Sequence, residues 1–454
     1  MTPVSVSDAP ALEWWRPDPP VTTSRTPAGE VTGSSAPTSG QSGFYALLAF
    51  TVVLIAAPQE FFEPLKPLRL ALVAAIVALV AYVVNLVAGR ARAPIAGREV
   101  RFALALVGWA IVTVPLSYWP SGSVTVLTEL YLKSIAVFIL LAGAIDSRRR
   151  LVGVVWTLGL CSVPIALTAL QHYQAGVFLP SAPGRIAGYG TSGLAGNPND
   201  LALLLNLILP FLVALAGRGS VGWRRGLAAV MALVAVAAVI VTFSRSGFIT
   251  LAAIALLYLW QAARRGRAGL AACVVVAALG VLVLAPAGYG ARLSTVGDID
   301  TDPTGSAQDR WRDIVAASGF VADHPVIGAG LGMDFLALNE RRGARWLSVH
   351  NAYLNYAVDL GLAGLAMFLA LFVGCLRRTG AVERARRAAG VDDVLTRVAG
   401  AARISLLAFG VGAFFYPVAY HAYFYYVAGL ALAVAQVAAG EARRQDSPEV
   451  RDAA

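Results

Sequence analysis

The stretch SVHNAYLNYAVDLGLAGLAMFLALFVGCL, residues 348–376, decides the fold. It begins polar and continues as an apolar run longer than the ~20 residues that a helix needs to cross a bilayer. The residues before it, 287–349, form a polar break. Because this break keeps apolar residues at helical spacing, we expect it to fold over the membrane surface. Its arginines are Arg292, Arg310, Arg312, Arg341, Arg342 and Arg345.

The composition of the chain is that of a polytopic membrane protein. Of its 454 residues 58% are hydrophobic and 14% are charged, and the mean hydropathy is +0.68. These values exclude an ordinary soluble domain. The net charge of +10 comes from short arginine clusters between apolar runs, and no single basic face is evident. This distribution indicates contact with membrane lipids and argues against nucleic acid as a partner.

Twelve apolar runs are long enough to be membrane-spanning helices. We therefore expect an all-α protein with a large, partly helical loop between its ninth and tenth spanning helices. The first nine helices occupy residues 43–288, the loop residues 289–349, and the last three helices residues 350–440. The individual runs are 43–58, 66–89, 101–119, 124–145, 151–172, 196–217, 224–242, 246–263, 268–288, 350–376, 400–418 and 421–439.

The ends of the chain and its cysteines carry no evident chemistry. Residues 1–42 are rich in Pro, Ser, Thr and Gly, so we expect a disordered cytoplasmic tail and not a signal peptide. Residues 441–454 are expected to form a second cytoplasmic tail. Cys161, Cys273 and Cys375 have no paired spacing, which supports neither a disulfide framework nor a zinc site.

The loops between the apolar runs alternate in charge, and this alternation predicts the orientation of the chain. One set of loops holds most of the lysine and arginine, and such loops stay in the cytoplasm. Both termini are then cytoplasmic, and loop 289–349 lies on the outer side of the membrane. The positive loops are 89–99, 146–150, 217–225, 263–267 and 377–390.

Arg245 lies in the turn TFSRSG, residues 242–247, between two apolar runs. An arginine at membrane depth is costly unless it meets a partner or an anionic ligand. The alternative is that its side chain snorkels to the interface. The neighbouring Ser and Gly favour close backbone approach, and therefore the ligand interpretation.

Arg310 and Arg312 lie in the helix-like segment DRWRDIVAASGFVADHPVIGAGLG, residues 309–332. A guanidinium is a planar fork that suits bidentate contact with phosphate. Two residues apart on a helix, the two arginines cannot share one face, so at most one should reach a common ligand. The alternative is that both are solvated and pair with Asp309 and Asp313.

His350 opens the tenth apolar run and is followed by Asn351. Histidine is the usual general base near neutral pH, although a lone interfacial histidine more often has only a structural hydrogen bond. Asn197 and Asn199 precede the sixth run, after a glycine-rich stretch that also holds Arg185. Both asparagines are good helix caps, which is one sufficient role, and Arg185 offers a further phosphate contact.

The acids of the polar break match only part of a calcium loop. Asp298, Asp300, Asp302 and Asp309 have some of its ligand spacing. Pro303 stands where such a loop requires glycine, and an aspartate replaces its bidentate glutamate. A solvated acidic turn is the favoured interpretation, and we expect no metal or other cofactor.

Four segments, in order, resemble the O-antigen ligase and polymerase superfamily of membrane glycosyltransferases. They are GLAGNPNDLALLL (193–205), TFSRSG (242–247), the Arg310 segment running into DHPVIGAGLGMDF (323–335), and VHNAYLNYAVDLGLAG (349–364). The resemblance covers roughly residues 190–375 and implies a GT-C-like fold. Where the family often shows a tryptophan four residues after its loop arginine, this chain has Ile314.

The resemblance implies a reaction and its residues. In that family the outer loop and an interior cavity bind a glycan linked to a polyprenyl diphosphate such as undecaprenyl diphosphate. Arg245 and Arg310 would contact the diphosphate and His350 would lie at the acceptor hydroxyl, giving inverting, metal-independent transfer to a lipid or glycan acceptor. Further substrate-binding candidates are Arg185, Asn197, Asn199, Asn351 and, ranked lower because it does not match the family arginine, Arg312.

Two other interpretations stay open at this point. A polymerase would join one lipid-linked repeat to another, whereas a ligase moves the glycan to a different acceptor. A transporter or flippase for lipid-linked sugars would show paired internal repeats and broken helices near the midplane. We see no convincing repeat, and the polar residues concentrate at the outer face.

Overall fold

The structure, a computed structural model, describes residues 40–91, 97–179, 185–190, 193–217, 219, 221–266, 269, 306–343 and 345–445. All of these belong to one unit, Ser39–Ala454. Four expectations fall wholly or mostly outside them: the N-terminal tail, the ninth apolar run at 268–288 except residue 269, the acidic turn at 298–302, and the C-terminal tail beyond residue 445.

Within these ranges, eleven helical segments are long and apolar enough to cross a membrane, and they match every expected span except the ninth. The polytopic all-α fold is confirmed. Apart from the isolated bridge Phe178–Ile186, the regular structure described is helical. The spans contain α1 (Gln41–Ile55), α2 (Leu70–Val87), α3 (Arg98–Thr113), α4 (Pro120–Val126) continuing through a π-helical turn, η5 (Leu127–Tyr131), into α5 (Leu132–Ala144), α6 (Arg148–Gln174), α7 (Pro198–Leu215), α8 (Gly222–Val241), α9 (Arg245–Arg264), α14 (Ala352–Ala388), α15 (Val394–Gly412) and α16 (Ala422–Gln445).

One span is displaced along the sequence from its expected position. We expected residues 400–418, but α15 begins at Val394 and ends at Gly412. The carboxylate of Asp393 accepts a hydrogen bond from the amide of Thr396 and so fixes the earlier start. Hydropathy does not detect such a polar cap.

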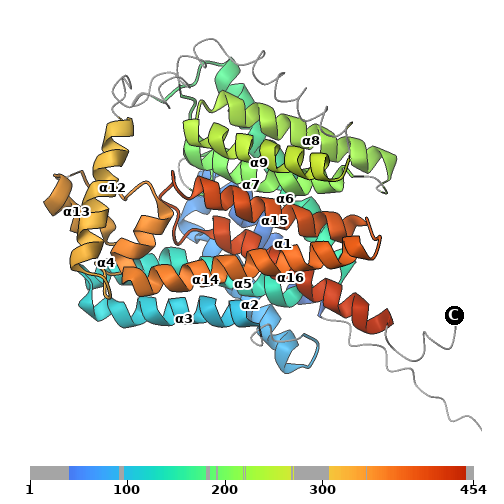
Figure 1. Cartoon of the computed structure of the whole chain (residues 1–454), viewed down its shortest axis with the longest axis horizontal. Coiled ribbons are helices and arrows are strands. Elements are labelled where there is room, and N and C mark those ends of the chain that lie inside the picture. The colour runs from blue at the N-terminus through green and yellow to red at the C-terminus, as the bar shows by residue number, and fades with distance from the viewer. Residues whose placement is uncertain are drawn as a thin grey trace, which may run out of the picture. The chain divides into compact units, whose positions relative to one another are not determined.

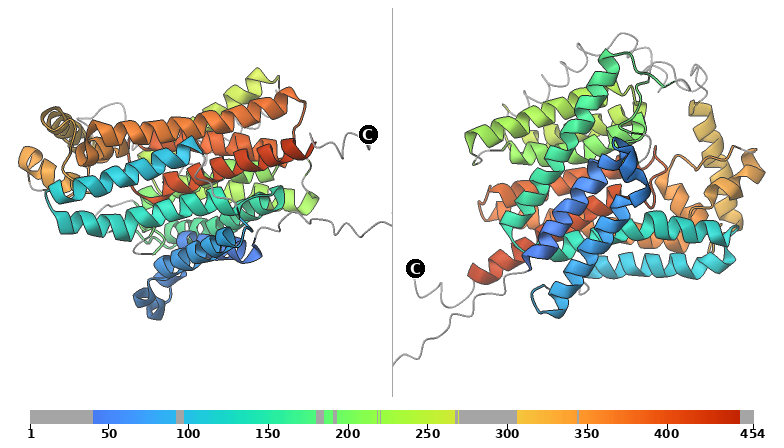
Figure 2. Two further views of the ribbon diagram at one scale, coloured as in Figure 1. Left: turned by 90° about the horizontal axis from the view of Figure 1, so that it is seen from below. Right: turned by 180° about the vertical axis from the view of Figure 1, so that it is seen from behind.

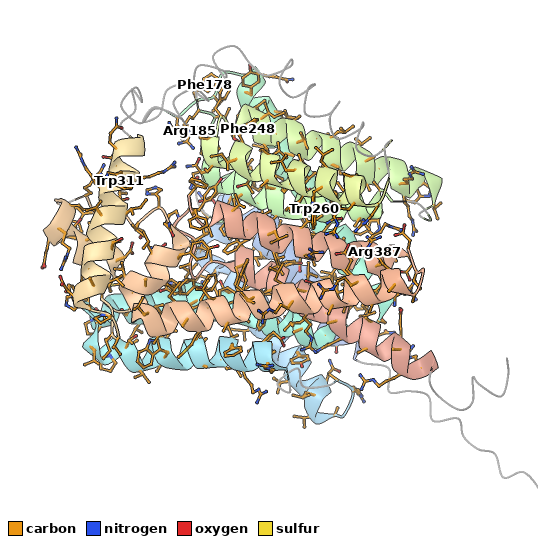
Figure 3. The ribbon with its side chains drawn as sticks, viewed as in Figure 1. Phe178, Arg185, Phe248, Trp260, Trp311 and Arg387 are labelled. Atoms are coloured by element: carbon orange, nitrogen blue, oxygen red, sulfur yellow. The ribbon has the colours of Figure 1, made fainter. Side chains whose placement is uncertain are left out.

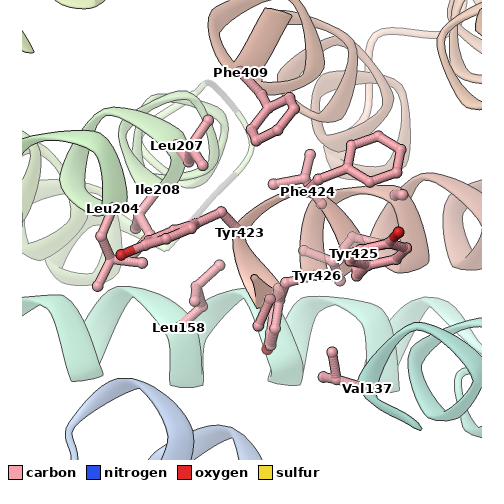
Figure 4. Close-up of a cluster of buried hydrophobic side chains, with 14 of the residues drawn as sticks. Val137, Leu158, Leu204, Leu207, Ile208, Phe409, Tyr423, Phe424, Tyr425 and Tyr426 are labelled. Carbon is pink, nitrogen blue, oxygen red and sulfur yellow. The ribbon is translucent and has the colours of Figure 1, made fainter. Parts of the chain in front are cut away.

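Helix α16 lies at the centre of the described bundle and packs against α5, α14 and α15 (Figures 1 and 2). Its residues 423–426 are four consecutive aromatic side chains, all buried. Because successive helical residues are about 100° apart, these rings cover most of the helix circumference. Figure 4 shows Tyr423 toward Leu204 and Ile208 of α7 and Phe424 toward Phe409 of α15. A helix that is buried on all sides has no face for lipid.

Helix α14 is kinked at Gly361, whose φ is 68°. The kink frees three carbonyls that a continuous helix would have bonded internally. The oxygens of Val358, Asp359 and Leu360 instead accept from the amides of Ala329 and Gly330 and from the Trp109 indole, at 2.8, 2.9 and 2.8 Å. The glycine-rich segment before α13 is thus bonded directly to the kink.

The expected loop between the ninth and tenth spans is partly helical, as predicted. It contains α12 (Ser306–Asp323) and α13 (Asp334–Arg342), here called the loop helices. They share a hydrophobic core of their own, separate from that of the spanning bundle, which includes Ala317, Phe320, Leu338 and Val358. Val358 belongs to α14, so this small core rests on the kinked helix.

Replacing Gly361 with Ala should destabilise the protein more than the same change at Gly390. Both glycines have positive φ, 68° and 73°, which costs an L-residue about 1–2 kcal/mol. A Cβ at Gly361 would also overlap the carbonyl of Val326, whereas nothing lies within 4 Å of one at Gly390. We expect Gly361→Ala to cost about 3 kcal/mol or more in all. Unfolding temperatures in detergent would measure the difference, and equal losses would contradict this account of the kink.

Candidate active site

One cavity lies where the loop helices meet the start of α14. Its lining carries three guanidiniums and two carboxylates, an arrangement that suits an anionic ligand. Figure 3 shows Trp311 of α12 and the loop residue Arg185 toward this same end of the helices. The lining residues are Asp309, Arg310, Asp313, Arg342, Arg345, Leu347 and His350.

His350 faces a carboxylate inside this cavity. Its Nδ1 lies 3.8 Å from Oδ2 of Asp313, whose side chain is only 7% exposed and whose Oδ1 pairs with Arg342. Burial acts to raise the pKa of Asp313, but His350 and Arg342 outweigh it and hold that pKa below its ordinary value. Asp313 is therefore anionic at neutral pH. Nδ1 is therefore the ring nitrogen of His350 that faces this carboxylate.

Arg310 and Arg312 point in different directions, as helix geometry predicts. Arg310 lines the cavity. Arg312 is 70% exposed and lies 3.8 Å from Asp309, so the structure does not bring it to the cavity. Burial raises the pKa of Tyr416 to about 12 while the charge on Arg310 opposes that shift, which places this phenol within electrostatic reach of Arg310.

Arg245 is the first residue of α9, directly after a tight turn. The hydroxyl of Ser244 caps the helix by accepting from the amide of Gly247 at 3.1 Å. A Cβ on Gly247 would lie 2.6 Å from that of Ala202 on α7. The close approach expected from the neighbouring Ser and Gly is confirmed, and it leaves Arg245 half-buried at the helix start.

Asn199 joins this turn to the glycine-rich loop. Its Oδ1 accepts from Nη2 of Arg185 at 2.6 Å and from the hydroxyl of Ser244 at 2.7 Å. The adjacent Asp200 interacts electrostatically with both Arg185 and His350. The segments that carry Arg185 and Arg245 therefore converge on the side of the cavity where His350 lies.

Asn197 and Asn351 have clear structural positions. The Oδ1 of Asn197 accepts from two amides in the first turn of α7, at 2.9 and 3.0 Å. The Oδ1 of Asn351 does the same in α14, at 3.0 and 3.1 Å. Each side chain is a helix cap, and Asn351 fixes the helix that follows His350.

Asp334 holds the residues just before His350. Its buried carboxylate accepts from the Val349 amide at 2.6 Å, the Ser348 hydroxyl at 3.1 Å and the Asn355 amide group at 2.9 Å. Burial raises the pKa of Asp334 to about 6, and these hydrogen bonds offset the shift only in part. The approach to His350 is thus clamped to α13.

The described residues contain no group of three or more His, Cys, Asp or Glu placed to hold a metal ion. The acids considered for calcium, Asp298, Asp300 and Asp302, lie outside those residues. Among the cysteines in the described ranges, Cys161 and Cys375 are buried and free.

Comparison with known proteins gives one informative match. Residues 205–369 match the family described as O-antigen ligase, and this range runs from α7 through the loop helices into α14. Over these residues the chain is similar to the O-antigen ligase and polymerase superfamily. No curated protein matches it. A solved structure titled "Structural coordination of polymerization and crosslinking by a peptidoglycan synthase complex" is similar at 20% identity and a TM-score of 0.41, covering 77% of this chain and 98% of that chain.

Five of the eight predicted site residues lie within the O-antigen ligase match, namely Arg245, Arg310, Arg312, His350 and Asn351. Arg185, Asn197 and Asn199 precede it. Arg185 and Asn199 are connected to the α8–α9 turn by the hydrogen bonds of Asn199.

Sequence reasoning missed part of the candidate site. Asp313 was considered only as a partner for the nearby arginines, and Arg342 only as one of several charges. The short spacing between Arg310 and Asp313, one helical turn, was an available signal that both face one side of α12. Tyr416 gave no signal, because it comes from the connection between α15 and α16.

Replacing Asp334 with Asn should flatten the dependence of stability on pH. An acid whose pKa is raised by folding contributes stability that is present below its ordinary pKa of 3.8 and is lost as the pH rises through about 6. Asn is neutral throughout, and its amide can donate to Ser348 while its oxygen accepts from Val349. Unfolding temperatures between pH 4 and 6 would test this, with the exposed Asp323→Asn as control. An unchanged slope in Asp334→Asn would contradict the burial argument.

Proposed function

We propose that this protein transfers a glycan from a polyprenyl-diphosphate carrier to an acceptor hydroxyl at the outer face of the cytoplasmic membrane. The observation that carries the proposal is the placement of His350, Asp313 and three guanidiniums in one cavity. The O-antigen ligase match supports a ligase- or polymerase-type function for the same residues. We favour a ligase, with a lipid or a glycan as acceptor.

His350 acts as the general base in this proposal. Because the Asp313 carboxylate lies beside Nδ1, Nε2 is the nitrogen that takes the proton of the acceptor hydroxyl as its oxygen attacks the anomeric carbon. The bond from that carbon to the diphosphate breaks as the new glycosidic bond forms, and the configuration inverts. Asp313 stabilises the imidazolium that results, as the third member of a catalytic triad does.

The arginines stabilise the departing diphosphate. Its negative charge grows as the anomeric bond breaks, and preorganised cations lower the energy of that state. Arg342 pairs with Asp313 and Arg345 with Asp309, so these two also hold the carboxylates in position. Arg310 of the lining and Arg245 of the α8–α9 turn are the diphosphate ligands we propose, and Arg185, held by Asn199, extends the positive surface.

The distribution of charge supports an outward-facing site with both termini in the cytoplasm. Helix α14 runs from Ala352, beside the cavity, to Ala388 at its other end. The arginine-rich connections 146–150, 263–266 and 377–390 lie at the helix ends away from the cavity, where Figure 3 shows Arg387. Loops rich in arginine remain in the cytoplasm.

Replacing Arg245, Arg310 or His350 with alanine should in each case lower the rate of glycan transfer by about 100-fold or more. This is the usual loss for a group that stabilises developing charge or moves a proton. Arg312→Ala is the matched control, because Arg312 lies on the same helix but is exposed and paired with Asp309. The assay uses protein in vesicles, an undecaprenyl-diphosphate oligosaccharide and candidate acceptors.

Several outcomes of that assay would overturn part of the proposal. Full activity in all three variants would remove the site assignment. A product with two oligosaccharides on one carrier would identify a polymerase in place of a ligase. Loss of transfer in a metal chelator, restored by a divalent cation, would contradict the metal-independent mechanism.

Asp313→Asn should lower the turnover number by at least about 10-fold while changing the donor KM much less. The loss follows because the amide no longer stabilises a protonated His350. Asp313→Glu should restore part of the activity, because it keeps a carboxylate beside His350. If Asp313→Glu is as slow as Asp313→Asn and both variants unfold at a lower temperature than wild type, Asp313 only supports the fold.

A further inference from the structure

Helix α12 has a second face, opposite the one that packs into the core of the loop helices. Ala316, Ala317 and Phe320 belong to that core and are buried. Because successive helical residues are about 100° apart, the residues three, four, seven and eleven positions after Trp311 lie with it on the other side of the helix. This side, here called the uncharged face of α12, consists of Trp311, Ile314, Val315, Ser318 and Ala322, all of them exposed.

The uncharged face is exposed although its side chains are apolar or small. Trp311 is 60% and Val315 54% exposed. The exposed charged residues of this helix, Arg312 and Asp323, lie about 100–120° around it from Trp311, at one edge of the uncharged face. A helix face turned to water normally carries charged and polar residues, so this face indicates a contact with something apolar.

Helix α12 runs across the direction of the spanning helices. Figures 1 and 2 show it lying across α3 and α14, near one end of both helices. Because α3 and α14 belong to segments long and apolar enough to cross a membrane, a helix that crosses them in this way is parallel to the membrane surface. Helices that lie in the plane of the interface turn one face toward the acyl chains.

Aromatic contacts near the C-terminal end of α12 indicate its depth relative to the membrane. The ring of Phe320 lies 6.0 Å from that of Tyr118, in the connection between α3 and α4. Tyr118 is 46% exposed, and the neighbouring Trp119 is 51% exposed. Tyrosine and tryptophan concentrate where a membrane meets water. The contact therefore places α12 at the level of that interface.

The chain that follows α12 leads directly to a spanning helix. The carbonyl of Pro325 accepts a hydrogen bond from the amide of Leu362 at 2.8 Å. Leu362 is the first residue after the kink of α14, and it is 49% exposed, while Val326 is 61% exposed. An exposed apolar surface therefore continues from the uncharged face of α12 to the part of α14 that crosses the membrane.

We propose that the uncharged face of α12 inserts into the interfacial region of the bilayer leaflet on the cavity side. Apolar side chains of such helices lie about 5–10 Å into the boundary between headgroups and acyl chains. Lipid is the contact that the structure favours over a protein partner, because the face continues into a spanning helix. The sequence predicted only that this segment folds over the membrane surface. The lipid contact does not depend on the transfer reaction.

The experiment measures how lipid quenches a fluorophore on α12. Val315→Cys and the control Glu340→Cys, an exposed position on α13, are made in a chain whose three native cysteines are replaced by alanine. Each is labelled with a nitrobenzoxadiazole dye and reconstituted at low protein density into phosphatidylcholine vesicles that contain nitroxide-labelled lipid. A nitroxide high on the acyl chain should quench the dye at position 315 at least about threefold more than at position 340, and more than a nitroxide at the chain end does. Iodide in the water should quench position 340 more.

The opposite results would overturn the proposal. Equal lipid quenching at the two positions, or stronger iodide quenching at position 315, would show that the face contacts water or awaits a protein partner. Shielding of position 315 only at high protein density would identify a second copy of the chain as its partner. If the cysteine-free chain does not accumulate, Trp311→Phe in the native chain should reduce the tryptophan emission that brominated lipid quenches, and an unchanged quenchable emission would equally contradict the lipid contact.

Discussion

The carbonyls freed by the kink of α14 are the constraint on which the position of the loop helices depends. An unsatisfied carbonyl in or near a bilayer costs several kcal/mol, so a break in a spanning helix needs donors from elsewhere. Here the donors are Ala329, Gly330 and Trp109. The Asp359 carboxylate accepts two further amides, from Gly332 and Asp334, at 3.0 and 2.8 Å. The kink and the loop helices therefore require each other.

The membrane architecture could be predicted because it rests on composition. The apolar runs predicted the spanning helices, and the arginine-rich break between two of them predicted the loop. The boundary of α15 could not be predicted from hydropathy, because a single carboxylate, Asp393, decides it. The kink at Gly361 was also missed. Its glycine is ordinary in sequence and becomes informative only when the Val326 carbonyl is seen against it.

The site was predicted at the level of residue types but not of pairings. His350 and Arg310 lie together, and Arg245 and Arg185 approach through Asn199. The partner of Asp313 is Arg342, 29 positions along the chain, and no local sequence pattern predicts a pairing over that separation. Asn197 and Asn351 illustrate the same limit, because the sequence does not distinguish an asparagine that caps a helix from one that binds a substrate. Contacts between side chains of different helices depend on the fold. The sequence identifies the groups that can make such contacts, but not which groups meet.

The separate core of the loop helices has a consequence for how the protein is assembled. Ala317, Phe320 and Leu338 belong to this core, which meets the bundle at Val358 and Leu354 of α14 and at Val126 of α4. Spanning helices can therefore insert and associate before this small core exists. Its closure supplies two of the three donors that the α14 kink needs, the amides of Ala329 and Gly330, so docking of the loop completes the hydrogen bonding of the kink. A chain halted before that step would be inserted in the membrane but would have no formed cavity.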